Sequence, residues 1–364
     1  MRHIGSMSPH CWINAMTQSR NAMARTVSVM TAAALLFATA ACQSGPSTSQ
    51  GAPPTPVANA TVNPGTAPEP EAGSFIQTEP LEIGEVIRPR DRILFLGDEL
   101  TQQMHYTRAI ATALLPLYPR GDLRFFNGGL DGATAASLGD RAEELIELTR
   151  PTLVFVCLGL NDAAATRPAR EIEAGFRTDL AALVERIRAA RRPRVVLISP
   201  PPLERESYSA SNATIYRLAI ATRDVAAAAG AGFVDMHVPM SKVYSSSTTA
   251  LTFDGRMPTE QGHVILASIV LYGIGVEAEK LDAVGWSPLL PLKMGQIRGA
   301  LGLPLRPVEP VAATRSRRLY ESMIQFDQQV FRAWRLEKGE RRRDVLTQAD
   351  GDWKAVREAL AQYR

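Results

Sequence analysis

Five short apolar segments, separated by helical patterns, stand out between residues 92 and 236. The segments are Arg92 to Leu96, Leu123 to Phe126, Thr152 to Leu158, Arg194 to Ser199 and Gly232 to Met236. Several are apolar at nearly every position, as strands covered on both faces must be. Apolar residues recur at helical spacing from Ile172 to Ile187 and again from Ile215 to Val225. The alternation predicts an α/β fold with three layers, in which helices cover both faces of a five-stranded parallel sheet.

Four polar segments lie at strand ends or in loops, and a parallel sheet binds its ligands at the carboxyl ends of its strands. They are Gly97 to Thr101, Asn127 to Gly132, Gly159 to Asp162 and Asp254 to His263. Their order and spacing resemble the four sequence blocks of the SGNH (GDSL-type) hydrolase family, over about Arg90 to Tyr272. The resemblance implies a flavodoxin-like α/β/α fold.

The resemblance also implies a mechanism of ester hydrolysis. In the family, a Ser after the first-block Gly-Asp attacks the ester carbonyl. The amide of that Ser, the amide of a second-block Gly and the side chain of a third-block Asn stabilise the oxyanion. The last block supplies an Asp and, three residues later, the His that takes the Ser proton. In this chain Gly129 takes the place of the oxyanion Gly, Asn161 that of the oxyanion Asn, and Asp254 that of the orienting Asp.

The two groups that make and break bonds are missing from this pattern. Glu99 stands at the nucleophile position and Met257 at the base position. A thioether has no proton to exchange, and a carboxylate is a poor nucleophile toward an ester. We therefore expect the usual chemistry to be absent and the site to be vestigial. The Glu99 carboxylate is expected to occupy the oxyanion hole itself, as a bound product anion would.

A displaced nucleophile and base form the alternative. Thr101 lies two residues beyond the nucleophile position, where a helix cap is the simpler interpretation. His263 lies six residues beyond the base position, and His237 follows the fifth predicted strand. An active enzyme built on these residues would be an ester hydrolase or acyltransferase acting on acylated glycans or lipids.

The N-terminal part of the chain has a different composition. After Arg25, an apolar run from Val27 to Ala41 leads to Cys42, which is typical of a secretory signal and too short for a spanning helix. The ending resembles the lipobox of bacterial lipoproteins, which implies a lipid on Cys42; an ordinary signal peptide cleaved nearby is the alternative. Residues 43–74 are rich in Pro, Ala, Ser and Thr and predict a disordered tether. We expect the protein to be held by its lipid in the bacterial cell envelope, facing the periplasm or the exterior.

Composition and charge exclude several other classes. The chain has 364 residues, and its 40 Lys and Arg against 37 Asp and Glu give no reason to expect a nucleic-acid partner. The three cysteines, Cys11, Cys42 and Cys157, form no cluster with histidine, so we expect neither a metal site nor a disulfide framework. No cofactor motif is present, and Cys157 is predicted to be a buried strand residue.

The expected SGNH-like domain covers residues 75–275, and residues 276–364 form a C-terminal extension. Apolar residues at spacings of three and four predict a helix from Ala312 through Trp334. A basic run, Arg341 to Arg343, and a last helix around Trp353 to Tyr363 are expected to follow. We expect the helices to pack on the parent domain, with a docking arm or a contact with anionic lipid as alternatives. The whole pattern favours an inactive binding or scaffolding domain, whose cleft takes a glycan or acyl ligand, or an inert structural lipoprotein.

Overall fold

The structure, a computed structural model, describes residues 79–335 and 340–363. These residues fall within one unit of the chain, Pro68–Arg364. The predicted signal peptide, the lipid site at Cys42 and the whole predicted tether lie outside the described residues. No helix among the described residues is long and apolar enough to cross a membrane.

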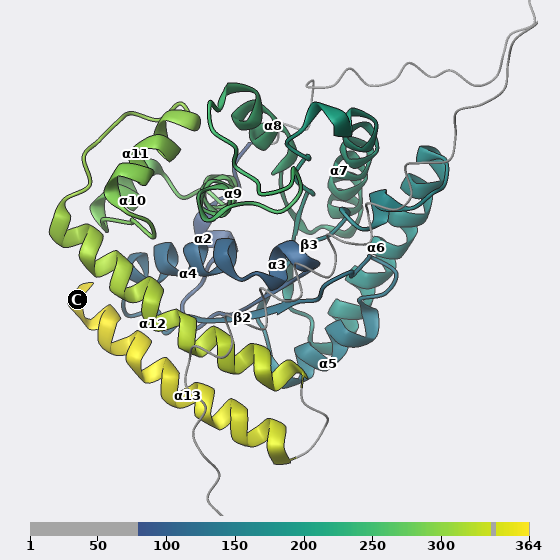
Figure 1. The fold of residues 1–364 in the computed structure, drawn as a ribbon. Helices are drawn as coiled ribbons and strands as arrows, with labels where there is room; N and C mark the ends of the chain where they lie inside the picture. Colours follow the sequence, from purple (N-terminus) through teal and green to yellow (C-terminus); the bar gives the residue numbers. More distant parts are fainter. Residues whose placement is uncertain (1–78, 336–339, 364) are drawn as a thin grey trace, which may run out of the picture. The chain divides into compact units, whose positions relative to one another are not determined.

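The sheet has five parallel strands in the order β2-β1-β3-β4-β5, which confirms the predicted fold class (Figure 1). The strands are β1 (Arg92–Gly97), β2 (Arg124–Gly129), β3 (Leu153–Cys157), β4 (Arg194–Ile198) and β5 (Gly232–Val234). Each begins within one residue of its predicted start. Gly97 is in register with Gly129 on one side and with Cys157 on the other, so the carboxyl ends of β1, β2 and β3 meet at one edge.

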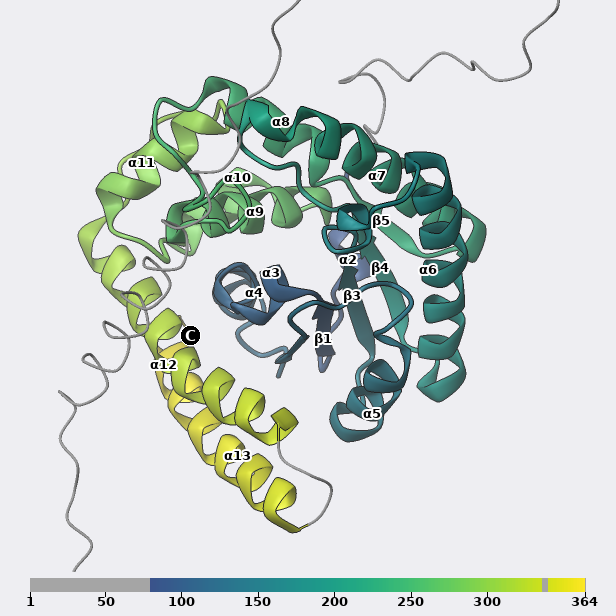
Figure 2. The same cartoon turned by 45° about the vertical axis from the view of Figure 1, so that its right-hand side comes forward.

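Helices cover both faces of this sheet (Figure 2). One face carries α5 (Gly139–Thr149), α6 (Ala169–Arg191) and α7 (Ser209–Ala229). The other carries α4 (His105–Leu117) and α9 (Glu260–Gly273). The shorter helices are α2 (Ile83–Val86), α3 (Glu99–Gln102), α8 (His237–Ser246), α10 (Ala278–Ala283) and α11 (Pro291–Ala300).

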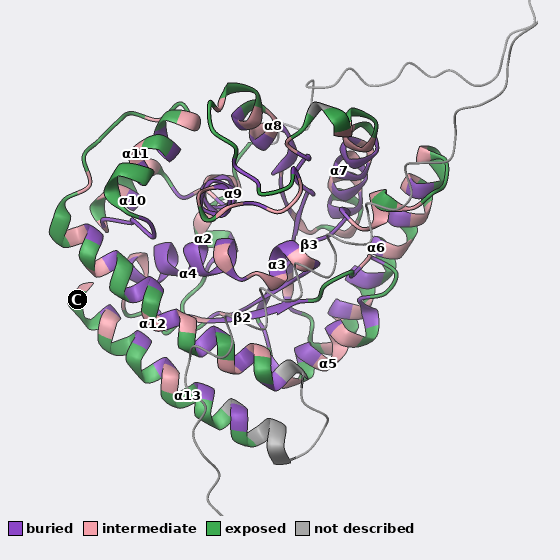
Figure 3. Ribbon diagram, viewed as in Figure 1, coloured by how far each residue is buried: buried purple, intermediate pink, exposed green. Residues whose placement is uncertain are grey.

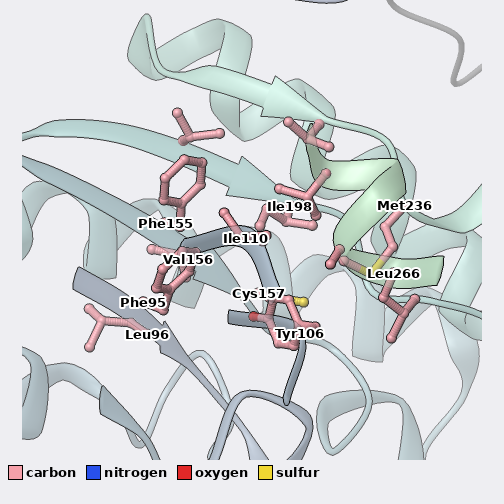
Figure 4. Close-up of a cluster of buried hydrophobic side chains, with 14 of the residues drawn as sticks. Phe95, Leu96, Tyr106, Ile110, Phe155, Val156, Cys157, Ile198, Met236 and Leu266 are labelled. Atoms are coloured by element: carbon pink, nitrogen blue, oxygen red, sulfur yellow. The ribbon is translucent and has the colours of Figure 1, made fainter. Parts of the chain in front are cut away.

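The core lies between the sheet and these helices: the strands and α4 are buried, while α6 exposes its outer side (Figure 3). Figure 4 shows Phe95 and Phe155 on neighbouring strands, with Tyr106 of α4 beside them. The Phe95 and Phe155 rings stack at 5.1 Å, and Tyr106 meets Phe95 edge-on at 6.3 Å. Cys157 is buried in β3, as predicted. Continuous burial of β3 explains why its sequence does not alternate.

The C-terminal helix α12 (Pro310–Arg335) packs on the strand β2 and the helix α4, and α13 (Glu340–Leu360) packs on α12. The ring of Phe326 lies 6.2 Å from that of Phe126 in β2 and 4.7 Å from that of Trp353. Asp327 accepts a 2.7 Å hydrogen bond from the Arg108 Nε of α4, and both side chains are buried. The helices therefore pack back on the parent domain. The run Arg341 to Arg343 lies inside α13, and the prediction that it precedes the last helix is wrong.

Candidate functional site

The polar segments predicted from the sequence meet at the carboxyl end of the sheet. Glu99 is the first residue of α3, directly after β1, and Asn161 lies on the loop after β3. Asp98 caps α3, because its Oδ1 accepts a 3.0 Å hydrogen bond from the Leu100 amide. This cap sets the direction in which α3 leaves the strand and places Glu99 at the edge of the sheet.

The Glu99 carboxylate binds groups from three other segments. Its Oε2 accepts hydrogen bonds from Asn161 Nδ2 at 2.7 Å and from the Gly132 amide at 3.4 Å. Its Oε1 accepts from Arg256 Nε at 3.1 Å and also from Arg256 Nη2. Burial acts to raise the pKa of Glu99, but the hydrogen bonds from Asn161, its own amide and Arg256 outweigh burial and lower that pKa. Glu99 is therefore ionised at neutral pH and occupies donors of the expected oxyanion hole.

Arg256 is the functional residue that sequence reasoning missed. Its Nη2 bonds the Glu99 carboxylate and also donates to Asn161 Oδ1 at 2.6 Å. The Glu99 and Arg256 side chains are 15% and 28% exposed, so the pair lies mostly out of solvent. A carboxylate so placed needs a cationic partner. The sequence does hold a signal for this role: a carboxylate at position 99 needs a cation nearby, and an Arg stands between Asp254 and Met257.

The amide that contacts the Glu99 carboxylate belongs to Gly132 and not to Gly129, the glycine that the sequence predicted for the oxyanion hole. The Gly129 amide donates to Asn127 Oδ1 at 3.0 Å and so is already engaged. A Cβ on Gly129 would lie 2.2 Å from the backbone nitrogen of Gln102, so Gly129 lets α3 pack closely on β2. Gly132 has a φ of +72°, which favours glycine, and this turn directs its amide toward Glu99.

Asp254 stabilises the loop on which it lies through hydrogen bonds to the backbone. Its Oδ1 accepts hydrogen bonds from the amides of Met257 at 2.7 Å and Arg256 at 2.8 Å. The bond from Met257 is the largest cause that lowers the pKa of Asp254, and the carboxylate is exposed. Asp254 therefore fixes the backbone of the base position, while the side chain there is a thioether.

The Met257 side chain is linked to a buried histidine through Gln103. Gln103 Nε2 donates to Met257 Sδ at 2.7 Å, and His263 Nε2 lies 2.7 Å from Gln103 Oε1. Because an amide oxygen can only accept, His263 carries its proton on Nε2. Its Nδ1 is buried without a hydrogen-bond partner, and burial lowers the pKa of His263 to about 3. His263 is thus a neutral core residue directed at Gln103.

The other alternative residues are engaged elsewhere. Thr101 Oγ1 lies 2.9 Å from the Tyr106 hydroxyl in the core, and Asp98 rather than Thr101 caps α3. The Nδ1 of His237 lies 3.2 Å from the Pro200 carbonyl, and burial lowers the pKa of His237 to about 4. Within the described residues, no hydrogen bond joins either side chain to Glu99 or Asn161.

Two further carboxyl groups brace the site. Burial, and then the charge of Glu99, raise the pKa of Asp98 to about 8, so Asp98 is a neutral acid beneath the ionised Glu99. Asp162 Oδ1 accepts from the Ala135 amide at 3.1 Å and joins the loops after β2 and β3. Burial raises the pKa of Asp162 to about 6. Within the described part of the chain, no cluster of three or more His, Cys, Asp or Glu side chains is arranged to hold a metal ion.

Comparison with known proteins identifies a family domain in part of this chain. The sequence profile of the GDSL-like Lipase/Acylhydrolase family matches residues 95–265. An acetylxylan esterase from Geobacillus stearothermophilus is 24% identical over 213 residues, which make up 51% of this chain and 95% of that enzyme.

Solved structures similar to this chain include that of Axe2, an acetylxylan esterase from Geobacillus stearothermophilus. It is 23% identical, with a TM-score of 0.47, and the match covers 53% of this chain and 97% of Axe2. A gut microbial diltiazem-metabolizing enzyme is 24% identical, with a TM-score of 0.45, over 52% of this chain and 48% of its own. Residues 95–265 of this chain are thus a domain of the GDSL-like lipase/acylhydrolase (SGNH) family.

Proposed function

We propose that this domain binds its ligand without hydrolysing it and acts as a binding or scaffolding module. The observation that carries the proposal is the engagement of the Glu99 carboxylate by Arg256, Asn161 and the Gly132 amide. An ester carbonyl would have to displace this carboxylate to reach the same donors. In a hydrolase of this type, loss of the nucleophile or the base alone lowers kcat by roughly 10⁶-fold. Glu99 and Met257 replace both groups.

Two properties of the chain support a place in the cell envelope. Cys42 follows an apolar run with the features of a secretory signal, and about 30 Pro-rich residues separate it from the folded domain. A lipid on Cys42 would then hold the domain at the membrane, facing the periplasm or the exterior. The tether would let the site reach ligands away from the bilayer.

The ligand class we propose is a glycan or an acyl group. The support is indirect, since the name of the acetylxylan esterase relative denotes an acetylated glycan as its substrate. The Glu99 and Arg256 side chains keep some exposure and offer both an acceptor and donors to a neutral polar ligand. Specificity in this fold lies in the loops around the site.

The relative's name also supports a second candidate, an active esterase or acyltransferase. Such an enzyme would need a displaced nucleophile and base. The buried Thr101 hydroxyl is paired with Tyr106, and the His263 ring is neutral and held by Gln103. These contacts favour the binding function.

Hydrolysis of p-nitrophenyl acetate by the purified protein tests the proposal. We expect no rate above the buffer background for the native chain or for Glu99→Ser alone. Glu99→Ser with Met257→His is expected to gain hydrolysis, because Asp254 already holds the backbone of position 257. The same pair with Arg256→Ala tests whether the guanidinium obstructs the repaired site. Hydrolysis by the native protein that is lost on Thr101→Val or His263→Asn would overturn the proposal in favour of the esterase.

A further inference from the structure

Met257 differs from the other methionines in the described residues in its access to solvent. Met257 is partly exposed. The remaining five are buried, with 7% or less of their surface accessible: Met104, Met236, Met240, Met294 and Met323. A buried thioether meets a dissolved oxidant only when the structure opens around it. Met257 is thus the one described methionine that an oxidant can reach in the folded state.

The Met257 sulfur is held in one orientation. Gln103 Nε2 donates to Sδ at 2.7 Å, and Gln103 is fixed from its other end by His263. His263 is 1% exposed, and its ring lies parallel to that of Tyr106, with the centroids 6.4 Å apart. Gln103 is therefore a rigid donor that occupies one side of the thioether.

The backbone around Met257 is equally constrained. Its amide donates to Asp254 Oδ1 at 2.7 Å, and its carbonyl accepts from the Phe253 amide at 2.9 Å. With both the backbone and one side of the sulfur fixed, only the second lone pair of Sδ is open to a reagent from solvent. Addition of oxygen to one defined lone pair creates one configuration at sulfur.

We propose that Met257 is a site of reversible oxidation by hydroperoxides that yields predominantly one methionine sulfoxide epimer. The free lone pair of the sulfur attacks the terminal oxygen of the hydroperoxide, and the O–O bond breaks. The departing alkoxide, or hydroxide from hydrogen peroxide, takes the proton that the transferred oxygen carried. It leaves as an alcohol or as water. The sulfur loses two electrons and the peroxide gains them.

Oxidation changes the polarity of the base position without repairing the base. The sulfoxide oxygen is a strong hydrogen-bond acceptor, while the thioether it replaces is a weak one. It carries no proton, so proton transfer is still missing. The modification therefore adds an acceptor to the residue that follows Arg256 in the chain, and it is independent of whether the domain hydrolyses esters.

Limited treatment of the full chain with hydrogen peroxide, followed by peptide mass spectrometry, tests the proposal. Met257 is expected to oxidise at least about ten-fold faster than each of the five buried methionines, because they require local opening. The oxidised protein is then incubated with MsrA or MsrB, each of which reduces one epimer. One reductase should remove most of the added oxygen and the other little.

Gln103→Leu is the control for the orientation of the sulfur. Without the donor, both lone pairs become available, and both reductases should act on the product. The epimer ratio of the native protein decides the matter even if this variant does not fold. Equal reduction of the native product by the two enzymes, or oxidation of Met257 no faster than of the buried methionines, would overturn the proposal.

Discussion

The carboxylate of Glu99 and the guanidinium of Arg256 form an ion pair at the position that the sequence resemblance assigns to the nucleophile of an SGNH hydrolase. Asn161 bonds both members, donating to Glu99 and accepting from Arg256. The two charges neutralise each other, and together they pair both the nitrogen and the oxygen of the Asn161 side-chain amide. The site is thus a closed polar network in which each member depends on the others.

Replacing Arg256 should destabilise the protein because it leaves Glu99 charged and largely shielded from water. For Arg256→Met we expect the free energy of unfolding to fall by about 1–3 kcal/mol, less than for a fully buried pair because both side chains keep some exposure. Urea unfolding measures this. Glu99→Gln with Arg256→Met removes both charges and should recover much of the loss. An unchanged stability in the single variant would contradict the shielded ion pair.

Asp98 should make stability fall as pH rises. Its folded pKa of about 8 lies above the unfolded value near 4, so between these limits the folded state holds a proton that the unfolded state has lost. The stabilising contribution is complete below pH 4 and is lost as pH rises through 8. The slope is at most about 1.4 kcal/mol per pH unit. Asp98→Asn keeps an acceptor for the Leu100 amide and should lack this slope. If the free energy of unfolding changes with pH in the same way for both proteins between pH 5 and 8, the raised pKa of Asp98 is refuted.

The pair of Arg108 and Asp327 should be costly to break. Both side chains are 7% exposed, so Asp327→Ala leaves a buried guanidinium without its carboxylate. We expect a loss of about 3–5 kcal/mol in unfolding free energy. Arg108→Met combined with Asp327→Leu replaces the pair by apolar groups and should lie close to the native protein. If the single and the double variants lose the same stability, packing rather than charge explains the effect.

Removal of residues 312–364 should lower the melting temperature by about 10 °C or more. The deletion leaves Arg108 without Asp327 and exposes the Phe126 ring that Phe326 covers. A loss of several kcal/mol lowers Tm by this amount in a domain of this size. Differential scanning calorimetry of the shortened and native chains makes the comparison. An unchanged Tm would indicate a separable docking arm.

Cys42→Ser should abolish lipid attachment. The native protein expressed in a bacterial host with labelled palmitate is expected to carry the label and to fractionate with membranes. The serine variant should carry none, because the acceptor thiol is missing. Labelling of both proteins, or of neither, would contradict the lipid site. Cys157→Ser is the matched control, since that cysteine is buried in β3.

The strands and the long helices were accessible from sequence because burial on both faces leaves a strong apolar signal. All five residues of β3 are buried, and the face of α6 from Ile172 to Ile187 repeats with the helical period. The predicted edge of the sheet therefore holds Glu99 and Asn161 together, as expected.

The finer geometry of the site depends on contacts that linear spacing does not encode. The sequence predicted Gly129 for the oxyanion hole, but Asn127 engages the Gly129 amide, and the Gly132 amide contacts Glu99 instead. Arg256 reaches Glu99 across 157 positions of sequence. The burial of His263 against Tyr106 likewise follows from how α4 and α9 pack. Contacts of this kind can be identified only once the helices and strands are arranged in space.

The position of α12 along β2 has a consequence for self-association. A strand at the margin of a sheet offers unpaired amides and carbonyls to a strand from another molecule, which is a common route to aggregation. Here α12 packs against β2, the longer of the two marginal strands, and the opposite margin is β5, with only three residues. Within the described part of the chain, the sheet thus presents little template for intermolecular strand pairing. Truncation before residue 312 would uncover β2 and should be monitored for light scattering as well as for melting.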